Sequence, residues 1–216
     1  MKVVLTGFRG TGKTSVGRIL ADRLALPFFD TDALIERRAG MPIPEIFLQH
    51  GEAHFRALER EVIASLRDVE GVISTGGGAV LDPANVADLR WRGTVYLLSA
   101  PPGVILERIA GSDRPGLTGL SPAEEVQTLL LARKEAYLGA ADACIDTGRR
   151  TPGEVAEVIL RAAGISAAER LERDHLLERF GLADLGEMVD RDPDLMVCAI
   201  AGNPCAHSKS PLLYNR

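Results

Sequence analysis

The sequence has no long apolar stretch, and no run approaches the roughly 18 residues that a membrane-spanning helix needs. Its N-terminus leads directly into a short apolar segment at residues 3–5. The basic, apolar and small-residue regions of a signal peptide are missing there. We therefore expect a cytoplasmic protein with no membrane partner.

Positive charge is not in excess either. The 25 Lys and Arg residues are outnumbered by 30 Asp and Glu residues, which gives a formal net charge of −5. A nucleic-acid-binding domain would show a basic patch or stripe. We expect no nucleic-acid partner.

Cysteine is scarce, with three residues at positions 144, 198 and 205 and no Cys-x-x-Cys spacing. An odd number without that spacing argues against a disulfide framework and against a cysteine-based metal site. What is present is ordinary for a globular protein: 216 residues, of which 46% are hydrophobic and 25% charged. This is enough for one substantial core with some sequence to spare.

Residues 7–14, Gly-Phe-Arg-Gly-Thr-Gly-Lys-Thr, match the phosphate-binding pattern GxxxxGK[ST] at every required position. An apolar run suited to a buried strand precedes them, and apolar residues at helical spacing follow. The backbone N–H groups of the turn and the positive end of the helix would then face an anionic ligand. We expect ATP, with Lys13 on its β- and γ-phosphates and the Thr14 hydroxyl on Mg²⁺.

Short apolar segments alternate with longer periodic segments over residues 2–163. The expected strands are 2–6, 27–30, 71–75, 94–99 and 143–146, and the expected helices are 13–25, two or more within 32–67, 83–91, 102–109, 122–138 and 152–163. Five strands separated by helices predict an α/β fold with a mostly parallel sheet covered on both faces. Ligands then bind at the carboxyl ends of the strands.

Two carboxylates follow the second expected strand, in Asp30-Thr31-Asp32. In an extended segment alternate residues share a face, so both carboxylates could project into the cleft. One could hold Mg²⁺ through water while the other accepts a hydrogen bond from a substrate hydroxyl. The alternative is that Thr31 or Asp32 simply caps the next helix.

Two arginines are candidates for binding an acidic substrate. Arg56 lies beside the apolar stripe of its helix, and Arg133 lies on a mainly apolar helix face. A guanidinium on such a face needs an anionic partner or a pocket edge. If the two converge, they form a bidentate carboxylate site. Taken singly, each is more commonly a solvated surface charge.

Two glycine-rich segments complete the candidate site. Gly76-Gly77-Gly78 ends the third expected strand and permits close approach of a ligand to the backbone. The alternative is a plain turn, for which two glycines would suffice. Residues 111–121 are polar and glycine-rich between two helices, which is the composition of a lid. Arg114 in this segment would lie over the phosphates on closure, or else be an exposed loop arginine.

These motifs, in this order and spacing, resemble those of shikimate kinases over about residues 1–163. The quoted matches are Gly7–Thr14, Asp30–Asp32, Phe55-Arg56, Gly76–Gly78, Arg114-Pro115, Arg133 with Tyr137, Ile145–Thr147 and Arg149-Arg150. The resemblance implies a P-loop NTPase fold of the nucleoside-monophosphate-kinase type, with a five-stranded parallel sheet flanked by helices on both faces. It also implies transfer of the ATP γ-phosphoryl group to the 3-hydroxyl of shikimate.

The resemblance further implies residue roles. Arg56 and Arg133 would hold the substrate carboxylate, and Asp32 would bind ring hydroxyls and act as base. The implied positions are Lys13, Asp32 and Arg114 for catalysis; Asp32, Arg56, Gly76, Gly77, Gly78 and Arg133 for substrate; Gly10, Thr11, Gly12, Lys13, Thr14, Ser15, Arg108, Arg114 and Arg150 for nucleotide; and Thr14 with Asp30 for Mg²⁺. One departure is Gly116, where a leucine is usual, and it bears on lid packing.

The composition changes after Gly164. Residues 165–194 have the pattern of a charged, helical linker, and residues 195–201 form a new strand-like run. Residues 201–211 are similar to the opening of shikimate dehydrogenase, whose paired serines would here be Ser208 and Ser210. Tyr214 stands where a histidine is usual, and the dehydrogenase's catalytic and nicotinamide-binding segments are absent. We expect a kinase domain at 1–164, a linker, and a truncated dehydrogenase-like segment at 195–216, from a fusion of the two enzymes or a frame-truncated product of one.

Two other functions stay open at this point. One is a kinase of the same fold for another hydroxylated carboxylic acid, such as gluconate, which Asp32, Arg56 and Arg133 do not exclude. The other is a non-catalytic nucleotide-binding module, against which the intact Lys13, Thr14 and Asp32 argue. We expect the kinase domain to be monomeric.

Overall fold

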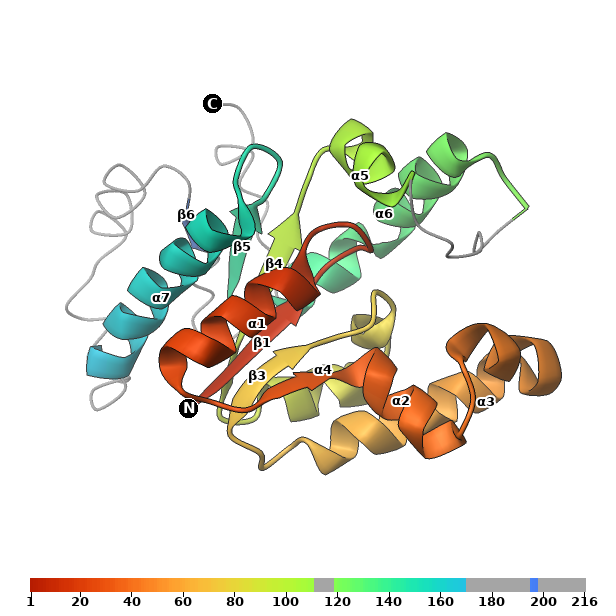
Figure 1. Ribbon diagram of the computed structural model, residues 1–216, viewed down its shortest axis with the longest axis horizontal. Helices are drawn as coiled ribbons and strands as arrows, with labels where there is room; N and C mark the ends of the chain where they lie inside the picture. The colour runs from red at the N-terminus through yellow and green to blue at the C-terminus, as the bar shows by residue number, and fades with distance from the viewer. Residues whose placement is uncertain (111–118, 170–194, 198–216) are drawn as a thin grey trace.

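The computed structural model describes residues 1–110, 119–169 and 195–197 (Figure 1). Its strands are β1 Lys2–Thr6, β2 Phe28–Asp30, β3 Gly71–Ser74, β4 Gly93–Ser99, β5 Ala143–Asp146 and β6 Leu195–Val197. They form one sheet in the order β2-β3-β1-β4-β5-β6. The first five strands are parallel, which confirms the expected five-stranded parallel sheet. β6 pairs antiparallel with β5 and extends the sheet by one edge strand.

The helices lie close to their expected positions. They are α1 Lys13–Leu24, α2 Thr31–Ala39, α3 Ile43–Ser65, α4 Pro83–Arg90, α5 Pro102–Ile109, α6 Pro122–Ala140 and α7 Pro152–Glu169, with a short 3₁₀ helix η1 at Ala79–Leu81. α3 is interrupted at Gly51, whose φ of 78° and ψ of 174° are not helical. α7 continues past residue 163, into the segment expected to be linker. Residues 170–194 and 198–216 lie outside the described residues, and with them most of that linker and the dehydrogenase-like motif.

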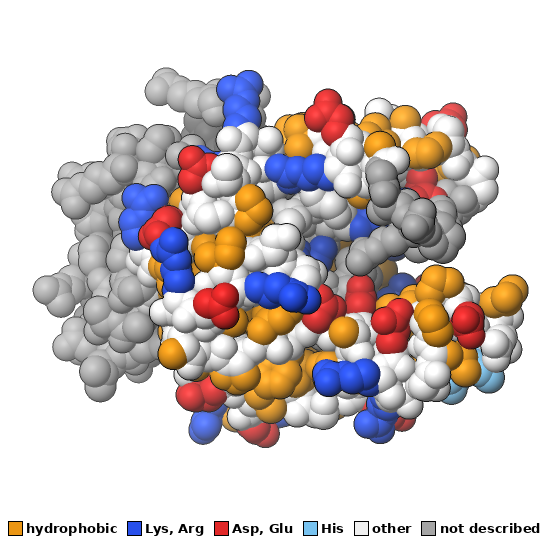
Figure 2. All heavy atoms as spheres, viewed as in Figure 1, with side chains coloured by type: hydrophobic (Ala, Val, Ile, Leu, Met, Phe, Trp, Pro, Cys, Tyr) orange, Lys and Arg blue, Asp and Glu red, His pale blue; other side chains and the backbone are white. Residues whose placement is uncertain are grey.

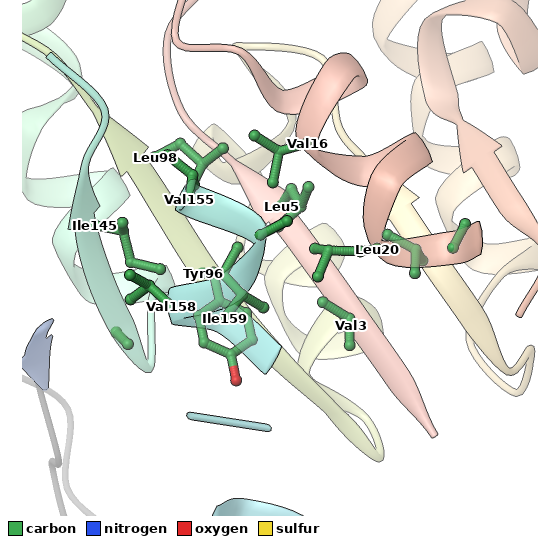
Figure 3. Close-up of a cluster of buried hydrophobic side chains, with 14 residues drawn as sticks. Val3, Leu5, Val16, Leu20, Tyr96, Leu98, Ile145, Val155, Val158 and Ile159 are labelled. Carbon is green, nitrogen blue, oxygen red and sulfur yellow. The ribbon is translucent and has the colours of Figure 1, made fainter. Parts of the chain in front are cut away.

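The core has two layers because the strands are buried on both faces. In β1, Val3 and Leu5 pack against α1 and α7, whereas Val4 between them packs against α3 and α4 on the other face. Figure 3 shows the first layer, in which side chains of β1, β4 and β5 meet side chains of α1 and α7. Alternate residues on opposite faces are what a strand covered by helices on both sides requires.

The second face is covered by α3, α4 and α6. α6 packs there through Tyr137 and Ala140 against Leu97 of β4. α6 begins with a capping box, in which the side chains of Ser121 and Glu124 satisfy each other's backbone N–H groups. Among the described residues, no helix combines the length and the apolar character that crossing a membrane requires.

All five parallel strands end at the same edge of the sheet, and the segments that follow β1, β2, β3 and β5 meet there. The phosphate-loop sequence follows β1, Asp30 ends β2, and the glycine triplet follows β3. The fold therefore brings together motifs that are up to about 140 residues apart in sequence, at the edge where open α/β sheets bind ligands.

Candidate active site

The phosphate loop joins β1 to α1, and its glycines are required by the backbone. Gly7 has a φ of 137°, and a methyl group built on it would lie 2.2 Å from the carbonyl oxygen of Leu98. Gly12 has a φ of 91° and precedes α1 without a side-chain cap. The first N–H groups of α1 thus remain directed into the loop, where they and the helix dipole favour an anion.

Lys13 is the first residue of α1 and is largely buried. Its Nζ donates hydrogen bonds of 2.8 Å to the carbonyl oxygens of both Gly7 and Phe8. The hydroxyl of Thr11 donates to the same Phe8 carbonyl over 2.7 Å. The ammonium charge is therefore held inside the loop, beside the space that a phosphate group would enter.

Asp30 connects the phosphate loop to the start of α2. One carboxylate oxygen, Oδ2, accepts a hydrogen bond of 3.0 Å from the hydroxyl of Thr14, and the other, Oδ1, accepts one of 3.1 Å from the backbone N–H of Asp32. Asp30 is thus the N-cap of α2, and the alternative that Thr31 or Asp32 caps this helix is wrong. The Thr31 hydroxyl instead accepts a hydrogen bond of 2.9 Å from the N–H of Gly76.

The placement of Asp32 also differs from the extended arrangement expected for Asp30-Thr31-Asp32. The chain turns into α2 at Thr31, so Asp32 lies in the first helical turn. Both carboxylates nevertheless line the same pocket. The pairing of a hydroxyl and a carboxylate at Thr14 and Asp30 supplies oxygen donors of the kind that Mg²⁺ prefers together with phosphate and water. No group of three or more His, Cys, Asp or Glu side chains suited to a metal occurs in the part of the chain that the structure describes.

A pocket of about 410 Å³ opens at the carboxyl edge of the sheet. Its walls come from the phosphate loop, from the ends of β2, β3 and β5, and from α5. The lining residues are Arg9, Gly10, Thr11, Gly12, Lys13, Thr14, Ser15, Val16, Asp30, Asp32, Ser74, Thr75, Gly77, Arg108, Thr147, Arg150, Pro152 and Val155. Figure 2 shows the hollow between the part that carries α5 and α6 and the part that carries α2 and α3, with charged side chains along its margin.

The glycine triplet after β3 is where the three acceptor candidates meet. A methyl group built on each glycine in turn shows this: at Gly76 it would lie 2.6 Å from Oδ1 of Asp32, at Gly77 3.7 Å from Nη1 of Arg133, and at Gly78 2.7 Å from Nη1 of Arg56. The structure therefore brings together side chains from α2, α3 and α6. Of the three, only the methyl group on Gly77 would fit without a clash, since its nearest neighbours lie at an ordinary contact distance of 3.6 Å.

Arg56 is held by two carboxylates of its own helix. Its Nη1 donates to Glu59 over 2.6 Å, and its Nε and Nη2 donate to one oxygen of Glu52 over 3.2 and 3.1 Å. Burial lowers the pKa of Arg56, but Glu59 and Glu52 outweigh that effect and raise the pKa above its ordinary value. The guanidinium is thus fixed in orientation next to Gly78.

Glu59 is almost fully buried, at 1% exposure, and one of its carboxylate oxygens has no hydrogen-bond partner among the described residues. Burial raises the pKa of the Glu59 carboxyl, Arg56 opposes that shift, and the nearby charge of Asp32 adds to it. Sequence reasoning missed this residue. The available signal was its position on the apolar stripe of α3, four residues after Phe55 and three before Val62.

Arg133 and Tyr137 extend from successive turns of α6 to the glycine triplet. The Tyr137 hydroxyl donates to the carbonyl oxygen of Gly77 over 2.6 Å, and Nη1 of Arg133 donates to the same oxygen over 3.2 Å. The Arg133 guanidinium also lies 5.9 Å from the ring centroid of Phe8, in the phosphate loop. α6 thus contacts both the loop and the acceptor side of the pocket.

A second link between α6 and the loop was not predicted from the sequence. Arg9 forms an ion pair with Glu125, in the first turn of α6, and Glu125 is 1% exposed. Phe8, beside Arg9, packs on Val126 and on Ile105 of α5. Glu125 stands directly before Val126 in a helix that mixes charged and apolar residues, and this local pattern does not indicate that its carboxylate is buried. The ion pair could therefore be recognised only from the structure.

The remaining candidates lie on the far side of the loop. Arg108 donates to the carbonyl oxygen of Gly10 over 3.3 Å and to the hydroxyl and carbonyl oxygens of Thr147 over 3.0 and 2.6 Å. Arg150 donates to the Asp146 carbonyl over 2.7 Å. Both arginines line the pocket. Arg114 and the rest of the lid expected at 111–121 fall mainly on residues 111–118, outside the described part.

The comparison with protein families agrees with this arrangement. A family model described as shikimate kinase matches residues 9–163, well over half of the chain and all of the site described above except Gly7 and Phe8. The chain belongs to the shikimate kinase family. Membership places it among ATP-using phosphotransferases of aromatic amino acid biosynthesis.

Curated relatives support the shikimate kinase assignment over the same region. The chain is 48% identical over 162 residues to a shikimate kinase of Caldanaerobacter subterraneus subsp. tengcongensis, a match covering 74% of this chain and 94% of the relative. It is 49% identical over 155 residues to a shikimate kinase of Geobacter sulfurreducens, covering 71% of this chain and 85% of the relative.

Solved shikimate kinases share the fold. The enzyme from Acinetobacter baumannii, in complex with shikimate, superposes with a TM-score of 0.73 at 35% identity, covering 76% of this chain and 93% of that one. The enzyme from Aquifex aeolicus gives 0.64 at 36% identity, covering 78% and 99%. A gluconokinase from Sinorhizobium meliloti gives 0.50 at 19% identity, covering 79% and 94%, which shows a common fold alone.

Proposed function

We propose that this enzyme transfers the γ-phosphoryl group of ATP to the 3-hydroxyl of shikimate, giving shikimate 3-phosphate and ADP. The observation that carries the proposal is the meeting of Asp32, Arg56 and Arg133 at three consecutive glycines beside the phosphate loop. Two guanidinium groups and one carboxylate suit an acceptor that carries both a carboxylate and hydroxyl groups. Family membership supports the same acceptor.

On the acceptor side, Arg56 and Arg133 bind the carboxylate and Asp32 accepts a hydrogen bond from a ring hydroxyl. Arg56 brings a preset orientation, because Glu52 and Glu59 already hold it from the side. Asp32 then has the position of a base that takes the proton of the attacking hydroxyl. Gly77 leaves room for the ring to approach the backbone, with Gly76 and Gly78 on either side.

On the nucleotide side, the loop residues 10–15 bind the phosphates through backbone N–H groups and the Lys13 ammonium. Thr14 and Asp30 are the residues that would hold Mg²⁺, the latter through water, and the ion when bound neutralises charge on the phosphate oxygens. Arg108 and Arg150 border the adenine. Arg114 covers the phosphates during transfer. Positioning and charge neutralisation supply most of the catalysis in this proposal.

We extend the proposal to the rest of the chain. The kinase domain comprises residues 1–164 and works in the cytoplasm as a monomer, 165–194 form a linker, and 195–216 begin a dehydrogenase-like segment fused to the kinase. What supports the fusion is the likeness of residues 201–211 to the opening of shikimate dehydrogenase. Reading the gene beyond the codon for Arg216 tests it, and a reading frame without a dehydrogenase there refutes it.

A coupled assay of ADP release tests the activity directly. We expect turnover with shikimate, Mg²⁺ and ATP, and none with gluconate at the same concentration. Activity with gluconate alone would refute the assignment of the acceptor. Binding of both ATP and shikimate without any turnover would show instead a non-catalytic nucleotide-binding module.

A further inference from the structure

The carbonyl oxygen of Gly77 accepts two hydrogen bonds, and the residues that donate them differ in their proposed roles. Arg133, at 3.2 Å, belongs to the proposed carboxylate site. Tyr137 gives the shorter bond, at 2.6 Å, yet none of the roles above uses it. A carbonyl oxygen has two lone pairs, so these two donors occupy both.

Tyr137 is the more deeply buried of the two donors. Its side chain is 4% exposed and packs in the cluster that includes Val80, Leu97 and Ala140. Burial also raises the pKa of its hydroxyl, although the Arg133 charge opposes the shift, so the group remains a proton donor throughout the neutral pH range. Arg133 is only partly buried and has other N–H groups to direct elsewhere.

The Gly77 carbonyl matters because of the peptide to which it belongs. The C=O of Gly77 and the N–H of Gly78 lie in one planar unit and point in opposite directions. Fixing the oxygen therefore fixes the direction of that N–H. Within the described residues, the N–H of Gly78 has no hydrogen-bond acceptor, and Gly77, which supplies the C=O of this peptide, lines the pocket.

Binding a carboxylate places a competing demand on Arg133. A bidentate pair uses two parallel N–H groups of the guanidinium and draws it towards the acid. The 3.2 Å bond from Arg133 to the Gly77 oxygen is the longer of the two bonds on that oxygen, and it is the bond that breaks when the guanidinium turns towards the acid.

We infer that Tyr137 is a positioning residue for the acceptor, which keeps the Gly77–Gly78 peptide in place while Arg133 transfers from the Gly77 carbonyl to the carboxylate of the substrate. The inference rests on the proposed function for the identity of that carboxylate. Without the tyrosine hydroxyl, engagement of Arg133 by the acid leaves the Gly77 oxygen without a donor, and substrate binding is weakened accordingly.

Tyr137→Phe tests this inference, because it removes the hydroxyl and keeps the buried ring. In the free variant, Arg133 still serves the Gly77 oxygen, so the melting temperature stays close to that of the unaltered protein. The loss of one hydrogen bond in the bound state raises the KM for shikimate by about tenfold. The KM for ATP changes by less than about twofold.

Tyr96→Phe is the matched control. Tyr96 is also a nearly fully buried tyrosine, but it lies in the cluster under α1 and α7, on the other face of the sheet (Figure 3). Removing its hydroxyl should leave the KM for shikimate unchanged, whatever it does to the melting temperature.

A second measurement separates positioning from packing. The methyl ester of shikimate cannot form a charged pair with Arg133, so Arg133 keeps its bond to Gly77. The binding of the ester, measured as competitive inhibition or as turnover, should therefore differ little between Tyr137→Phe and the unaltered enzyme, while binding of the free acid differs by about tenfold.

The outcomes distinguish the two proposals. If the unaltered enzyme phosphorylates shikimate and Tyr137→Phe has the same KM for it, the positioning role is wrong and the proposed function stands. Equal increases in both KM values with a lower melting temperature would show a packing role and also overturn the inference. If the unaltered enzyme does not phosphorylate shikimate, the proposed function fails and the inference falls with it.

Discussion

The nucleotide side and the acceptor side of this site are built in different ways. The phosphate-binding part of the nucleotide side is one continuous segment, residues 7–15, whose shape depends on glycine backbone angles and on the start of α1. The acceptor side consists of side chains from α2, α3 and α6, which meet only at the glycine triplet after β3. One side is thus determined locally and the other by packing between distant elements. A substitution on one side of the site should therefore impair the function of that side and leave the other side intact.

The largest effects are expected from removing one charge on each side. Lys13→Met removes the ammonium held in the phosphate loop, so kcat should fall by about a thousandfold, while shikimate affinity changes by less than about threefold.

Arg133→Ala should raise the KM for shikimate by about a hundredfold, or abolish turnover, with ATP affinity nearly unchanged. Steady-state kinetics and direct titration with each ligand measure both effects.

Lys134→Ala is the control for Arg133→Ala, since it removes the neighbouring charge of α6 at an exposed position. It should leave both KM values unchanged. An equal loss of ATP affinity in Arg133→Ala would contradict the separation of the two sides.

A pair of glycine substitutions sharpens the same comparison. Gly7→Ala places a methyl group 2.2 Å from a backbone carbonyl at a positive φ, so we expect a loss of about 3 kcal/mol in the free energy of unfolding. Gly77→Ala meets nothing closer than 3.6 Å, so stability should change by less than about 0.5 kcal/mol. Its KM for shikimate should nevertheless rise at least about tenfold, because the methyl group occupies the acceptor's space. Urea titrations and kinetics decide between these outcomes; a destabilised Gly77→Ala would mean that this glycine serves the fold.

The ion pair that joins the two sides should be worth more than an exposed one. Glu125→Ala leaves the Arg9 charge without its buried carboxylate, and we expect a loss of about 3 kcal/mol in the free energy of unfolding. Glu157→Ala breaks a pair with Arg23 whose two side chains are about half exposed, and should cost less than about 1 kcal/mol. Equal losses in the two variants would show that α6 does not depend on this contact.

The smallest effect concerns the pH dependence of stability. Because burial raises the pKa of Glu59 in the folded protein, the folded state holds its proton more tightly than the unfolded state does. Stability then declines as the pH rises from the ordinary carboxyl value through the raised one. Glu59→Gln removes this decline. The stability of the unaltered protein minus that of the variant should therefore be smaller at pH 8 than at pH 5, and a larger difference at pH 8 would contradict the burial argument.

The fold could be predicted because each segment carries its own pattern. Apolar runs and helical spacing located five strands and the helices between them within a few residues of their observed ends, apart from α7, which continues to Glu169 instead of ending at residue 163. The break in α3 at Gly51 and the short helix η1 were missed, since a half-buried glycine and an apolar triplet that ends in an exposed leucine give no distinctive local signal. The antiparallel pairing of β6 with β5 was also missed, because direction in a sheet depends on where the rest of the chain has gone.

The sequence by itself determined the phosphate loop, from the glycines at fixed spacing to the lysine and threonine that begin α1, because backbone geometry over eight residues is a local property. It also indicated which distant residues are candidates for the acceptor. Only the tertiary structure decided that Asp32, Arg56 and Arg133 meet at the glycine triplet, that Asp30 both caps α2 and pairs with Thr14, and that Glu59, Glu125 and Tyr137 support the site. Most of these contacts join residues from elements far apart in the chain, whereas Glu59 supports Arg56 within α3 and Asp30 caps the helix beside it. The distant contacts and the burial of Glu59 follow from how the helices pack on the sheet, and no local pattern encodes that packing.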